Sequence, residues 1–509
     1  MSDSCPQSSR LAPRDEASSR GARWLPFCLL IALSGCPGPD SGPNGTENDS
    51  LSGVTLQLLV VDDPELVAAV DRLRGEWQAQ KGADFEIKTV AAAELTDADV
   101  QAADAVICPS CQLGPLAEAG LLAEVPEKLR PNKILVDGRP ADNRDDPWSG
   151  TFELLRACEA VWAGKLYAVP LGSPVFVGYY RADLLEKLGR RPPQTWAQYQ
   201  ELAELFADRQ NLGDAAGIDQ TAWCGTIEPL APGWAGLVLL ARAAPYAKRR
   251  ASYSTLFDIE SMEPLIASPA FVRALEELVA AARLSPEESL RSDPTVARTA
   301  FWQGRCGMAL TWPTAAKDGL SGQPAAHVQV GFVELPGSNE VYRPDDPEPL
   351  SRSDSDDPRV PLLAVAGRLG VVSAESEHQE GAFRLLFWLA GDQYGPQVSP
   401  FSAATTLFRH SHMESPGRWA EEPMPASAAG RYADLTEQTM RRQHWLFALR
   451  IPGRAEYLQV LDEAVRAAVL GDRTPTEALQ AAAERWDRIT AKYGVEQQRA
   501  AYRHSAAWD

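Results

Sequence analysis

Two cysteines near residue 110 have the spacing of a redox site. Cys108 and Cys111 are separated by two residues, as in thioredoxin-type proteins, where the first cysteine lies at a helix N-terminus that lowers its pKa. Here Cys108 ends a strand-like run at 105–108, and no thioredoxin-like pattern surrounds it. We therefore expect a structural disulfide or inert buried thiols rather than redox catalysis. Five cysteines follow Cys36, so at least one of them is free or pairs between chains.

Other catalytic and metal-binding patterns are missing from the sequence. It contains neither the Gly-x-Ser-x-Gly elbow of a serine hydrolase nor a His-Glu-x-x-His helix. His410 and His412 have no third ligand nearby in sequence, and a surface loop is the better interpretation. The Pro- and Asp-rich segment 343–359 lacks EF-hand spacing, so we expect a solvated loop there. The sequence predicts no enzyme, no metal and no cofactor.

The segments that would position a site alternate between strands and helices. Apolar, β-branched runs at 54–61, 85–90 and 104–108 predict strands. Asp63, followed by a proline, predicts the start of a helix after the first strand, and a short helix is expected at 113–122. Such alternation indicates a parallel sheet with helices on both faces.

The same alternation restarts further along the chain. Helices are predicted at 195–206, after Ser268, around Tyr457 and from Thr474, where Thr474 and Glu477 form a capping box. Further strands are predicted at 164–172, 176–180, 307–312, 328–335 and 362–373. The chain is therefore predicted to be α/β with more than one sheet.

The N-terminal region has the features of an export signal. A segment with four arginines precedes the apolar run 24–34, which is too short to span a bilayer. The run ends at Leu33-Ser34-Gly35-Cys36, which resembles the bacterial lipobox, whose cysteine is lipidated. We expect residues 1–35 to be a lipoprotein signal peptide and 36–53, rich in Pro, Gly, Ser and Asn, to be a flexible tether. The resemblance implies a protein outside the cytoplasm, anchored to the membrane through Cys36.

Composition narrows the classes of partner. The 509 residues carry 49 Lys and Arg against 69 Asp and Glu, a formal net charge of −20. This excess of acid argues against nucleic acid as a partner, because phosphates require clustered cations. Hydrophobic residues make up 45% of the chain, enough for a large core.

The order of segments resembles extracellular solute-binding protein family 1, the maltose-binding-protein-like receptors of ABC importers. The resemblance extends from residue 54 to about 495. It rests on LGPLAEAGLL (113–122), GKLYAVPLG (164–172), YYRADLLEKLGRRPPQTWAQY (179–199), FWQGRCGMALTWP (301–313), VGFVELPG (330–337), AGRLGVVSAES (366–376) and the tail 450–479. Single motifs are weak, but their shared order is specific.

The resemblance implies a two-lobed periplasmic-binding-protein-like fold, each lobe a mainly parallel sheet flanked by helices, with a ligand cleft between the lobes. By analogy, the N-terminal lobe takes 54–170 and 336–399, and the C-terminal lobe takes 171–335 and 400–509. The ligand would be a sugar or a sugar-like solute. The partners would be the permease subunits of an ABC transporter, and the receptor is expected to be a monomer.

Aromatic rings and planar polar groups are what a sugar site requires. Trp312, before a proline at the end of a strand, is the best single candidate for stacking on a sugar, and Trp223 and Trp234 are further candidates. Glu228 lies in a Glu-Pro loop like one that contacts ligand in maltose-binding relatives. Tyr457 lies on the helix expected near the cleft. For Trp223 and Trp234 the alternative is packing under the loop, and for Tyr457 it is packing in the core.

The polar candidates follow the predicted strands of the first lobe. They are Asp62, Asp63, Ser110, Gln112 and Ser173. Asp63 could equally serve as a helix cap. The segment 108–112 lacks the aromatic and charged pair of sugar-binding relatives, which weakens an oligosaccharide specificity. A non-sugar solute such as a polyamine or a metal therefore stays open, as does a sensor or scavenger without transport.

Overall fold

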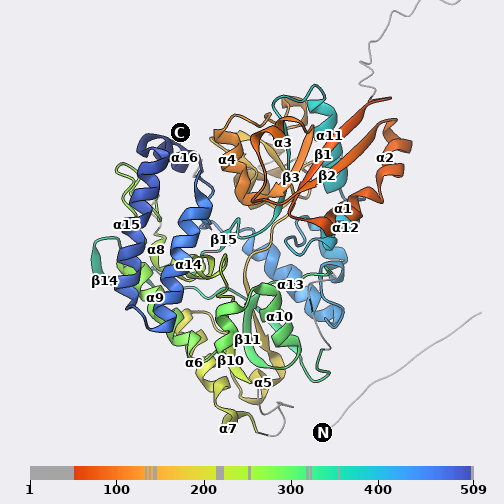
Figure 1. The fold of residues 1–509 in the computed structure, drawn as a ribbon. Helices are drawn as coiled ribbons and strands as arrows, with labels where there is room; N and C mark the ends of the chain where they lie inside the picture. Colours follow the sequence, from red (N-terminus) through yellow and green to blue (C-terminus); the bar gives the residue numbers. More distant parts are fainter. Residues whose placement is uncertain are drawn as a thin grey trace, which may run out of the picture. The chain divides into compact units, whose positions relative to one another are not determined.

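The apolar run after residue 53 forms a strand of a five-stranded sheet in the computed structural model (Figure 1). This strand, β1 (Thr55–Val61), pairs in parallel with β2 (Asp84–Val90) and β3 (Ala105–Pro109). On the other side of β3 lie β16 (Arg368–Val372) and β8 (Ala168–Gly172). Because β16 runs antiparallel to both neighbours, four strands share one direction and β16 alone is reversed.

The structure describes residues 51–131, 135–136, 139–140, 146–213, 223–249, 254–316, 320, 324–353 and 356–505. The expected signal peptide and Cys36 lie outside these residues. Among the described residues, no helix combines the length and the apolar character needed to cross a bilayer.

A second sheet repeats the plan with four strands. Its order is β10 (Cys224–Ile227), β11 (Cys306–Thr311), β9 (Val177–Arg181) and β12 (Val330–Glu334). β10 and β11 are parallel, and β9 runs antiparallel to both β11 and β12. Here too one strand, β9, is reversed. Each reversed strand is the first that the chain enters after leaving the other sheet, so the segments 173–176 and 335–367 are the crossovers.

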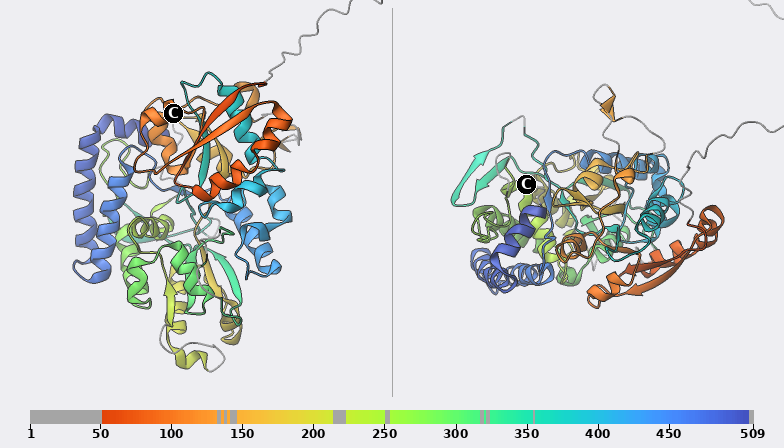
Figure 2. Two further views of the ribbon diagram at one scale, coloured as in Figure 1. Left: turned by 45° about the vertical axis from the view of Figure 1, so that its right-hand side comes forward. Right: turned by 90° about the horizontal axis from the view of Figure 1, so that it is seen from above.

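The second crossover contains a hairpin that the sequence did not predict. β13 (Glu340–Arg343) pairs antiparallel with β14 (Asp346–Ser351), and the hairpin extends away from the helices in Figure 2. The expectation of a solvated loop over 343–359 was therefore wrong for this part. Tyr342 is buried and its ring lies 6.3 Å from that of Tyr246, which anchors β13. The prolines of β14 are tolerated because this strand has one neighbour only.

Helices cover the first sheet. α1 (Pro64–Asp71) and α2 (Arg74–Lys81) follow β1, and the single helix expected over this region is interrupted at Arg72 and Leu73. α4 (Leu113–Glu118) follows β3, and α11 (Gln379–Ala390) packs on β8 and β16. The buried leucines of α11 meet Gly370, where a β-carbon would lie 2.5 Å from Leu386. The chain also forms four shorter helices, which are α3 (Asp97–Gln101), α5 (Ala182–Lys187), α7 (Arg209–Leu212) and α12 (Gly395–Val398).

The second sheet has helices on both faces. α6 (Trp196–Ala207) packs against β10 and β11, where Gly225 and Gly307 let its backbone approach closely. A β-carbon at Gly225 would lie 2.1 Å from the carbonyl oxygen of Ala203, and one at Gly307 would lie 2.4 Å from Phe206. α10 (Pro294–Trp302) packs on β11, and α13 (Ala426–Thr439) packs on β12.

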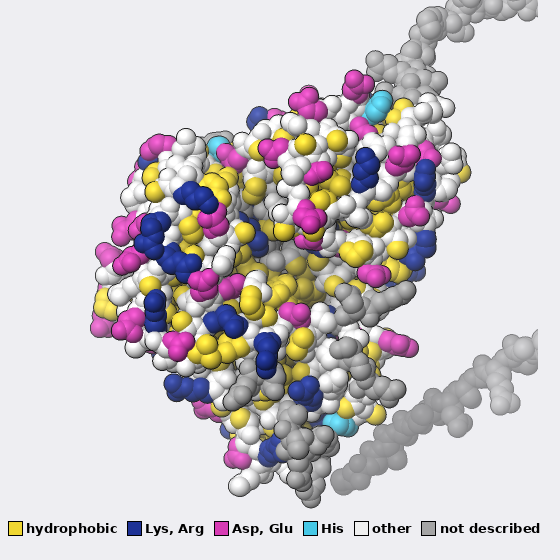
Figure 3. All heavy atoms as spheres, in the orientation of Figure 1, with side chains coloured by type: hydrophobic (Ala, Val, Ile, Leu, Met, Phe, Trp, Pro, Cys, Tyr) yellow, Lys and Arg dark blue, Asp and Glu magenta, His cyan; other side chains and the backbone are white. Residues whose placement is uncertain are grey.

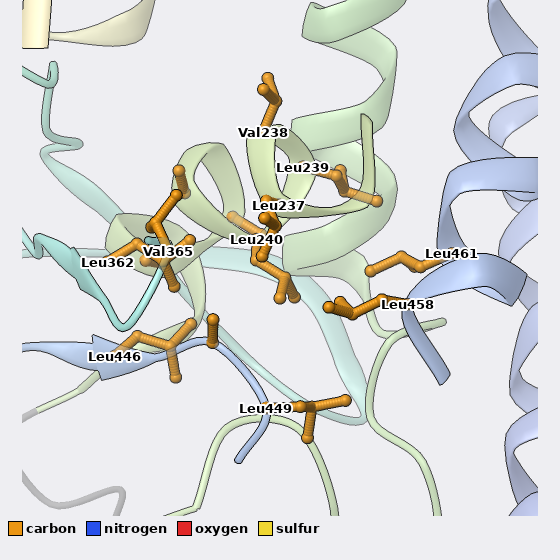
Figure 4. Close-up of a cluster of buried hydrophobic side chains, with 14 of the residues drawn as sticks. Leu237, Val238, Leu239, Leu240, Leu362, Val365, Leu446, Leu449, Leu458 and Leu461 are labelled. Atoms are coloured by element: carbon orange, nitrogen blue, oxygen red, sulfur yellow. The ribbon is translucent and has the colours of Figure 1, made fainter. Parts of the chain in front are cut away.

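A helical layer joins these parts. α8 (Ala235–Ala247) and α9 (Pro269–Ala282) pack on α14 (Arg454–Leu470) and α15 (Pro475–Tyr493), and α16 (Val495–Ser505) follows. The predicted capping box of Thr474 and Glu477 is confirmed at the start of α15. Figure 4 shows leucines of α8 and α14 meeting beside the short parallel pair β15 (Leu362–Leu363) and β17 (Leu446–Phe447).

Candidate functional site

The carboxylate of Asp63 holds three segments together at the end of β1. One oxygen accepts a hydrogen bond from the backbone N–H of Leu66 at 3.1 Å, which caps α1. The other accepts from Nε of Arg368 at 2.7 Å and from the hydroxyl of Ser402. All three charged or polar side chains are buried. The capping alternative is thus realised, together with a buried ion pair to the first residue of β16.

Asp62 differs from its neighbour in exposure. It is exposed, has a φ of +53°, and accepts a hydrogen bond from the backbone N–H of Ala92 at 2.8 Å. A positive φ is uncommon outside glycine, although Asp tolerates it better than most residues. This conformation turns the chain sharply from β1 into α1 and leaves the Asp62 carboxylate at the surface.

Ser110 and Ser173 meet at one carbonyl in the second crossover. The hydroxyl of Ser110 donates to the carbonyl oxygen of Ala366 at 2.8 Å, and that of Ser173 lies 3.1 Å from the same oxygen. Ser173 also contacts Oε1 of Glu159 at 2.7 Å. Glu159 ends the π-helical turn Leu155–Glu159 and is fully buried. Burial raises the pKa of the Glu159 carboxyl, while the hydrogen bond from Ser173 opposes that rise.

The backbone next to the Ala366 carbonyl connects the two serines with the ion pair of Asp63. Gly367 accepts a hydrogen bond from the backbone N–H of Ser110 at 3.1 Å, and Arg368, the partner of Asp63, follows it in sequence. Gln112 ends the short 3-10 helix that begins at Ser110 and is partly exposed. Asp63, Ser110, Gln112 and Ser173 therefore belong to one region, at the edge of the first sheet where the crossovers leave it.

Three aromatic rings converge on the side of the second sheet. Trp312 follows β11, Trp234 precedes α8, and Phe176 is the last residue of the first crossover. The Trp312 ring centroid lies 5.6 Å from that of Phe176 and 5.6 Å from that of Trp234. Trp312 is 4% exposed, whereas Trp234 is partly exposed. Such a cluster offers apolar faces on which the C–H face of a sugar could stack.

One short segment joins the two sides. The indole N–H of Trp312 donates to the carbonyl oxygen of Ala403 at 2.9 Å, and the preceding residue, Ser402, is the partner of Asp63. Two adjacent residues, Ser402 and Ala403, therefore connect the segment after β1 with the segment after β11. Figure 3 shows hydrophobic side chains gathered in a recess on the face of Figure 1, between the regions of the two sheets.

A buried ion pair supports Trp312 from behind. Nη1 of Arg298 donates to the Trp312 carbonyl oxygen at 2.8 Å, and Nε of Arg298 lies 3.3 Å from Glu421. The hydroxyl of Tyr179 also donates to Glu421, at 3.1 Å. Burial raises the pKa of Glu421 to about 7, although the Arg298 charge opposes the rise. Arg298 is therefore placed to fix the backbone that carries the indole ring.

Three predicted residues are engaged in contacts outside the aromatic cluster. The indole N–H of Trp223 donates to the carbonyl oxygen of Phe206 at 2.8 Å, at the end of α6. Glu228 forms a buried ion pair at 2.5 Å with Arg242, which stacks on the Trp196 ring. Packing under the loop, the alternative given for Trp223, accounts for its contact, and the ion pair engages the Glu228 carboxylate within the chain.

Tyr457 is the third of these residues. It is fully buried in the helical layer, where its hydroxyl lies 2.8 Å from that of Thr490 and its ring lies 5.1 Å from that of Trp486.

Sequence reasoning missed Arg368, Ser402, Glu159 and Phe176. Arg368 could have been found, because a charged residue inside the apolar run 362–373 requires a buried partner. Phe176 was visible only as part of a strand. Nothing in the local sequence distinguishes Glu159 or Ser402, since their partners come from segments far along the chain.

Within the described part of the chain, no group of three or more His, Cys, Asp or Glu side chains could hold a metal ion. A surface cavity of about 610 Å³ lies beside α13, lined by charged residues that include Asp357, Glu437 and Arg442. None of the residues predicted for the site lines that cavity.

The family described as Bacterial extracellular solute-binding protein matches residues 63–396. The chain belongs to this family. The match extends over well more than half of the sequence and includes Asp63, Ser110, Ser173, Trp234 and Trp312. The members of the family bind solutes, and the resemblance found in the sequence is confirmed.

Solved structures give the same fold. Maltose-bound MalE3 of T. maritima superposes with a TM-score of 0.60 at 20% identity, covering 86% of this chain and 100% of that one. A solute-binding protein of Agrobacterium radiobacter K84 in complex with ribitol gives 0.59 at 18%, covering 86% and 99%. One of Agrobacterium vitis S4 with D-mannitol gives the same values. The two-lobed periplasmic-binding-protein-like fold is therefore confirmed.

Proposed function

We propose that this protein is an extracytoplasmic receptor that binds a sugar or polyol and delivers it to the permease of an ABC transporter. The observation that carries the proposal is the convergence of Phe176, Trp234 and Trp312 at the end of the second sheet, beside the polar strand ends of the first. The solved relatives with ribitol, D-mannitol and maltose support this solute class.

The recognition follows from the chemistry of the two sides. The partly exposed face of Trp234 would stack on the C–H face of the solute, with Trp312 fixed beneath it by Arg298 and Ala403. Asp62 and Gln112 are the candidate polar contacts, because both are accessible at the surface. A solute that touches both sides would favour closure of the lobes about the crossovers, in the manner of a hinge. The predicted lobes, 54–170 with 336–399 and 171–335 with 400–509, require one shift. Because β8 of the first sheet extends to Gly172, we assign the first boundary between residues 172 and 173.

A thermal-shift titration of the exported full chain tests the solute class. Maltose, ribitol and D-mannitol are the sugar and polyol probes, and putrescine, spermidine and divalent metal salts are the cationic ones. At a hundredfold excess over Kd, a bound solute adds about 2.7 kcal/mol to the free energy of unfolding. We expect at least one sugar or polyol to raise the melting midpoint. If only the cationic probes raise it, the carbohydrate assignment fails.

Two tryptophan variants locate the site. Trp234→Ala should weaken binding of the best probe about five- to thirtyfold, which corresponds to the loss of about 1–2 kcal/mol of aromatic contact. Trp223→Ala is the matched control, because Trp223 contacts Phe206 on α6 and lies outside the aromatic cluster. Equal affinities for the two variants would show that the solute binds elsewhere.

We also propose that Cys36 is lipidated and anchors the receptor to the membrane as a monomer. The support is the Leu33-Ser34-Gly35-Cys36 sequence after a short apolar run. Metabolic labelling with a palmitate analogue should mark the wild-type chain, and Cys36→Ala should remove both the label and the membrane association. A Cys28→Ala control, within the apolar run, should keep both. A soluble, unlabelled wild-type chain would contradict the anchor.

A further inference from the structure

Two cysteines that are distant in sequence stand side by side in the second sheet. Cys224 begins β10 and Cys306 begins β11, and the two are register partners in this parallel pair. Neighbouring strands lie about 4.8 Å apart. That spacing falls within the Cα separations of roughly 4.4–6.8 Å that a disulfide bridges.

Their side chains point to the same face of the sheet. The next residues, Gly225 and Gly307, face α6, so Cys224 and Cys306 face away from α6, toward the core shared with α10. Both cysteines are buried, at 7% and 0% exposure. Cys224 Sγ donates to the carbonyl oxygen of Arg305 at 3.6 Å, and the Cys224 side chain is among the groups that raise the pKa of the Cys306 thiol.

We propose that Cys224 and Cys306 form a disulfide that fastens the edge strand β10 to β11 once the chain is outside the cytoplasm. The location rests on the proposed function, but the pairing rests on the register of the two strands alone. The three other described cysteines have no such partner in the sheets; Cys108, for instance, faces Leu369 of β16. The bond would close a loop of about 80 residues and would remove β10 as a strand that can detach on its own.

The oxidant is a disulfide-bearing exchange partner, such as an extracytoplasmic dithiol oxidase or glutathione disulfide. The Cys224 thiolate, the more exposed of the two, attacks a sulfur of that disulfide and displaces one thiolate. The Cys306 thiolate then attacks Cys224 Sγ and displaces the second, so two protons and two electrons pass to the oxidant. Burial raises the pKa of the Cys306 thiol, so the exchange belongs to a stage of folding before β10 docks.

Peptide mapping tests the bond directly. The full chain is exported in a bacterial host, quenched in acid, unfolded, alkylated without reductant and digested. We expect a cross-linked peptide pair that contains Cys224 and Cys306 and that disappears after dithiothreitol. Complete alkylation of both cysteines, or a pair that joins either of them to a different cysteine, would overturn the proposal. This readout does not depend on any solute, so it is separable from a failure of the sugar assignment.

A second experiment tests whether the two cysteines pair because of their positions in the sheet, independently of the compartment in which the chain folds. The same chain, made in the cytoplasm and refolded in a glutathione redox buffer, should form the identical pair. Dithiothreitol should then lower its melting midpoint by roughly 5 °C, as expected for a loop of this length in a large domain. Cys306→Ala should start at the lower midpoint and be insensitive to dithiothreitol, whereas Cys158→Ala, the matched control, should behave as wild type. Reduction without any change in the wild-type midpoint would count against a structural bond.

Discussion

The two sides of the candidate site differ in how their side chains are already engaged. On the first-sheet side, the side chains of Asp63, Ser110 and Ser173 are all hydrogen-bonded to other parts of the chain. On the second-sheet side, the rings of Trp234 and Trp312 meet at an angle of 47°, and Trp234 stays partly exposed. A carboxylate at a strand end can contact a ligand only if the helix cap and the ion pairs of the chain leave its oxygens unoccupied, and those of Asp63 are occupied.

The largest effect is expected on the aromatic side. Trp312→Ala should lower the free energy of unfolding by about 4 kcal/mol, because it empties a buried indole volume. Trp312→Phe keeps most of that packing and loses the hydrogen bond to Ala403, so a loss of about 1–2 kcal/mol is expected. Urea denaturation measures both. A phenylalanine variant as unstable as the alanine variant would show that the N–H bond, and not packing, holds this side.

On the first-sheet side, a conservative substitution should lose most of the stability that the alanine substitution loses, unlike Trp312→Phe on the aromatic side. Asp63→Ala removes the α1 cap and leaves the buried Arg368 without its carboxylate, which should cost about 3 kcal/mol. Asp63→Asn keeps the cap but not the charge. It should therefore recover less than half of the stability that Asp63→Ala loses, as measured by the same urea series. If Asn equals wild type, the ion pair contributes nothing and the contrast between the sides collapses.

The pH dependence of stability tests the support behind Trp312. The Glu421 carboxyl has a pKa of about 7 in the folded protein against 4.5 when unfolded, because it is buried. Between these values the unfolded chain binds fewer protons, so the free energy of unfolding should fall as pH rises from about 4.5 to 7, on the order of 2 kcal/mol. Glu421→Gln should lack this contribution. Parallel curves for the two proteins from pH 5 to 8 would refute the raised pKa.

The smallest effect on stability is expected at Asp62. Asp62→Gly loses the hydrogen bond to Ala92 but relieves a positive φ, so stability should change by less than about 0.5 kcal/mol. Binding of the best sugar probe should nevertheless weaken severalfold, measured by calorimetry, if this carboxylate contacts the solute. Unchanged affinity would remove Asp62 from the site and leave recognition to the aromatic side.

Most of the fold was predictable from the sequence because strands and helices here carry strong local signals. The runs at 54–61, 85–90 and 104–108 became β1, β2 and β3, and Thr474 caps its helix as expected. The hairpin β13–β14 was missed, since its strands are polar and its stability comes from Tyr342 packing on distant helices.

The site was predictable only in part, for a related reason. The residue types at strand ends were visible, and Trp312 and Trp234 do come together. Their engagement was not visible, because the partners of Asp63 lie 305 and 339 residues away in the chain. Glu228 illustrates the limit: its Glu-Pro context suggested a ligand contact, whereas its buried partner, Arg242, stands on a helix with no matching local signal.

The segment around Ser402 and Ala403 makes contact with both sides within two residues, through Asp63 and through Trp312. Its neighbour Ala404 is only partly buried. An environment-sensitive dye attached at Ala404→Cys would therefore report any shift of either side, whatever solute causes it. The receptor could in this way be turned into an optical sensor, and used to screen for its own solute, before that solute is known.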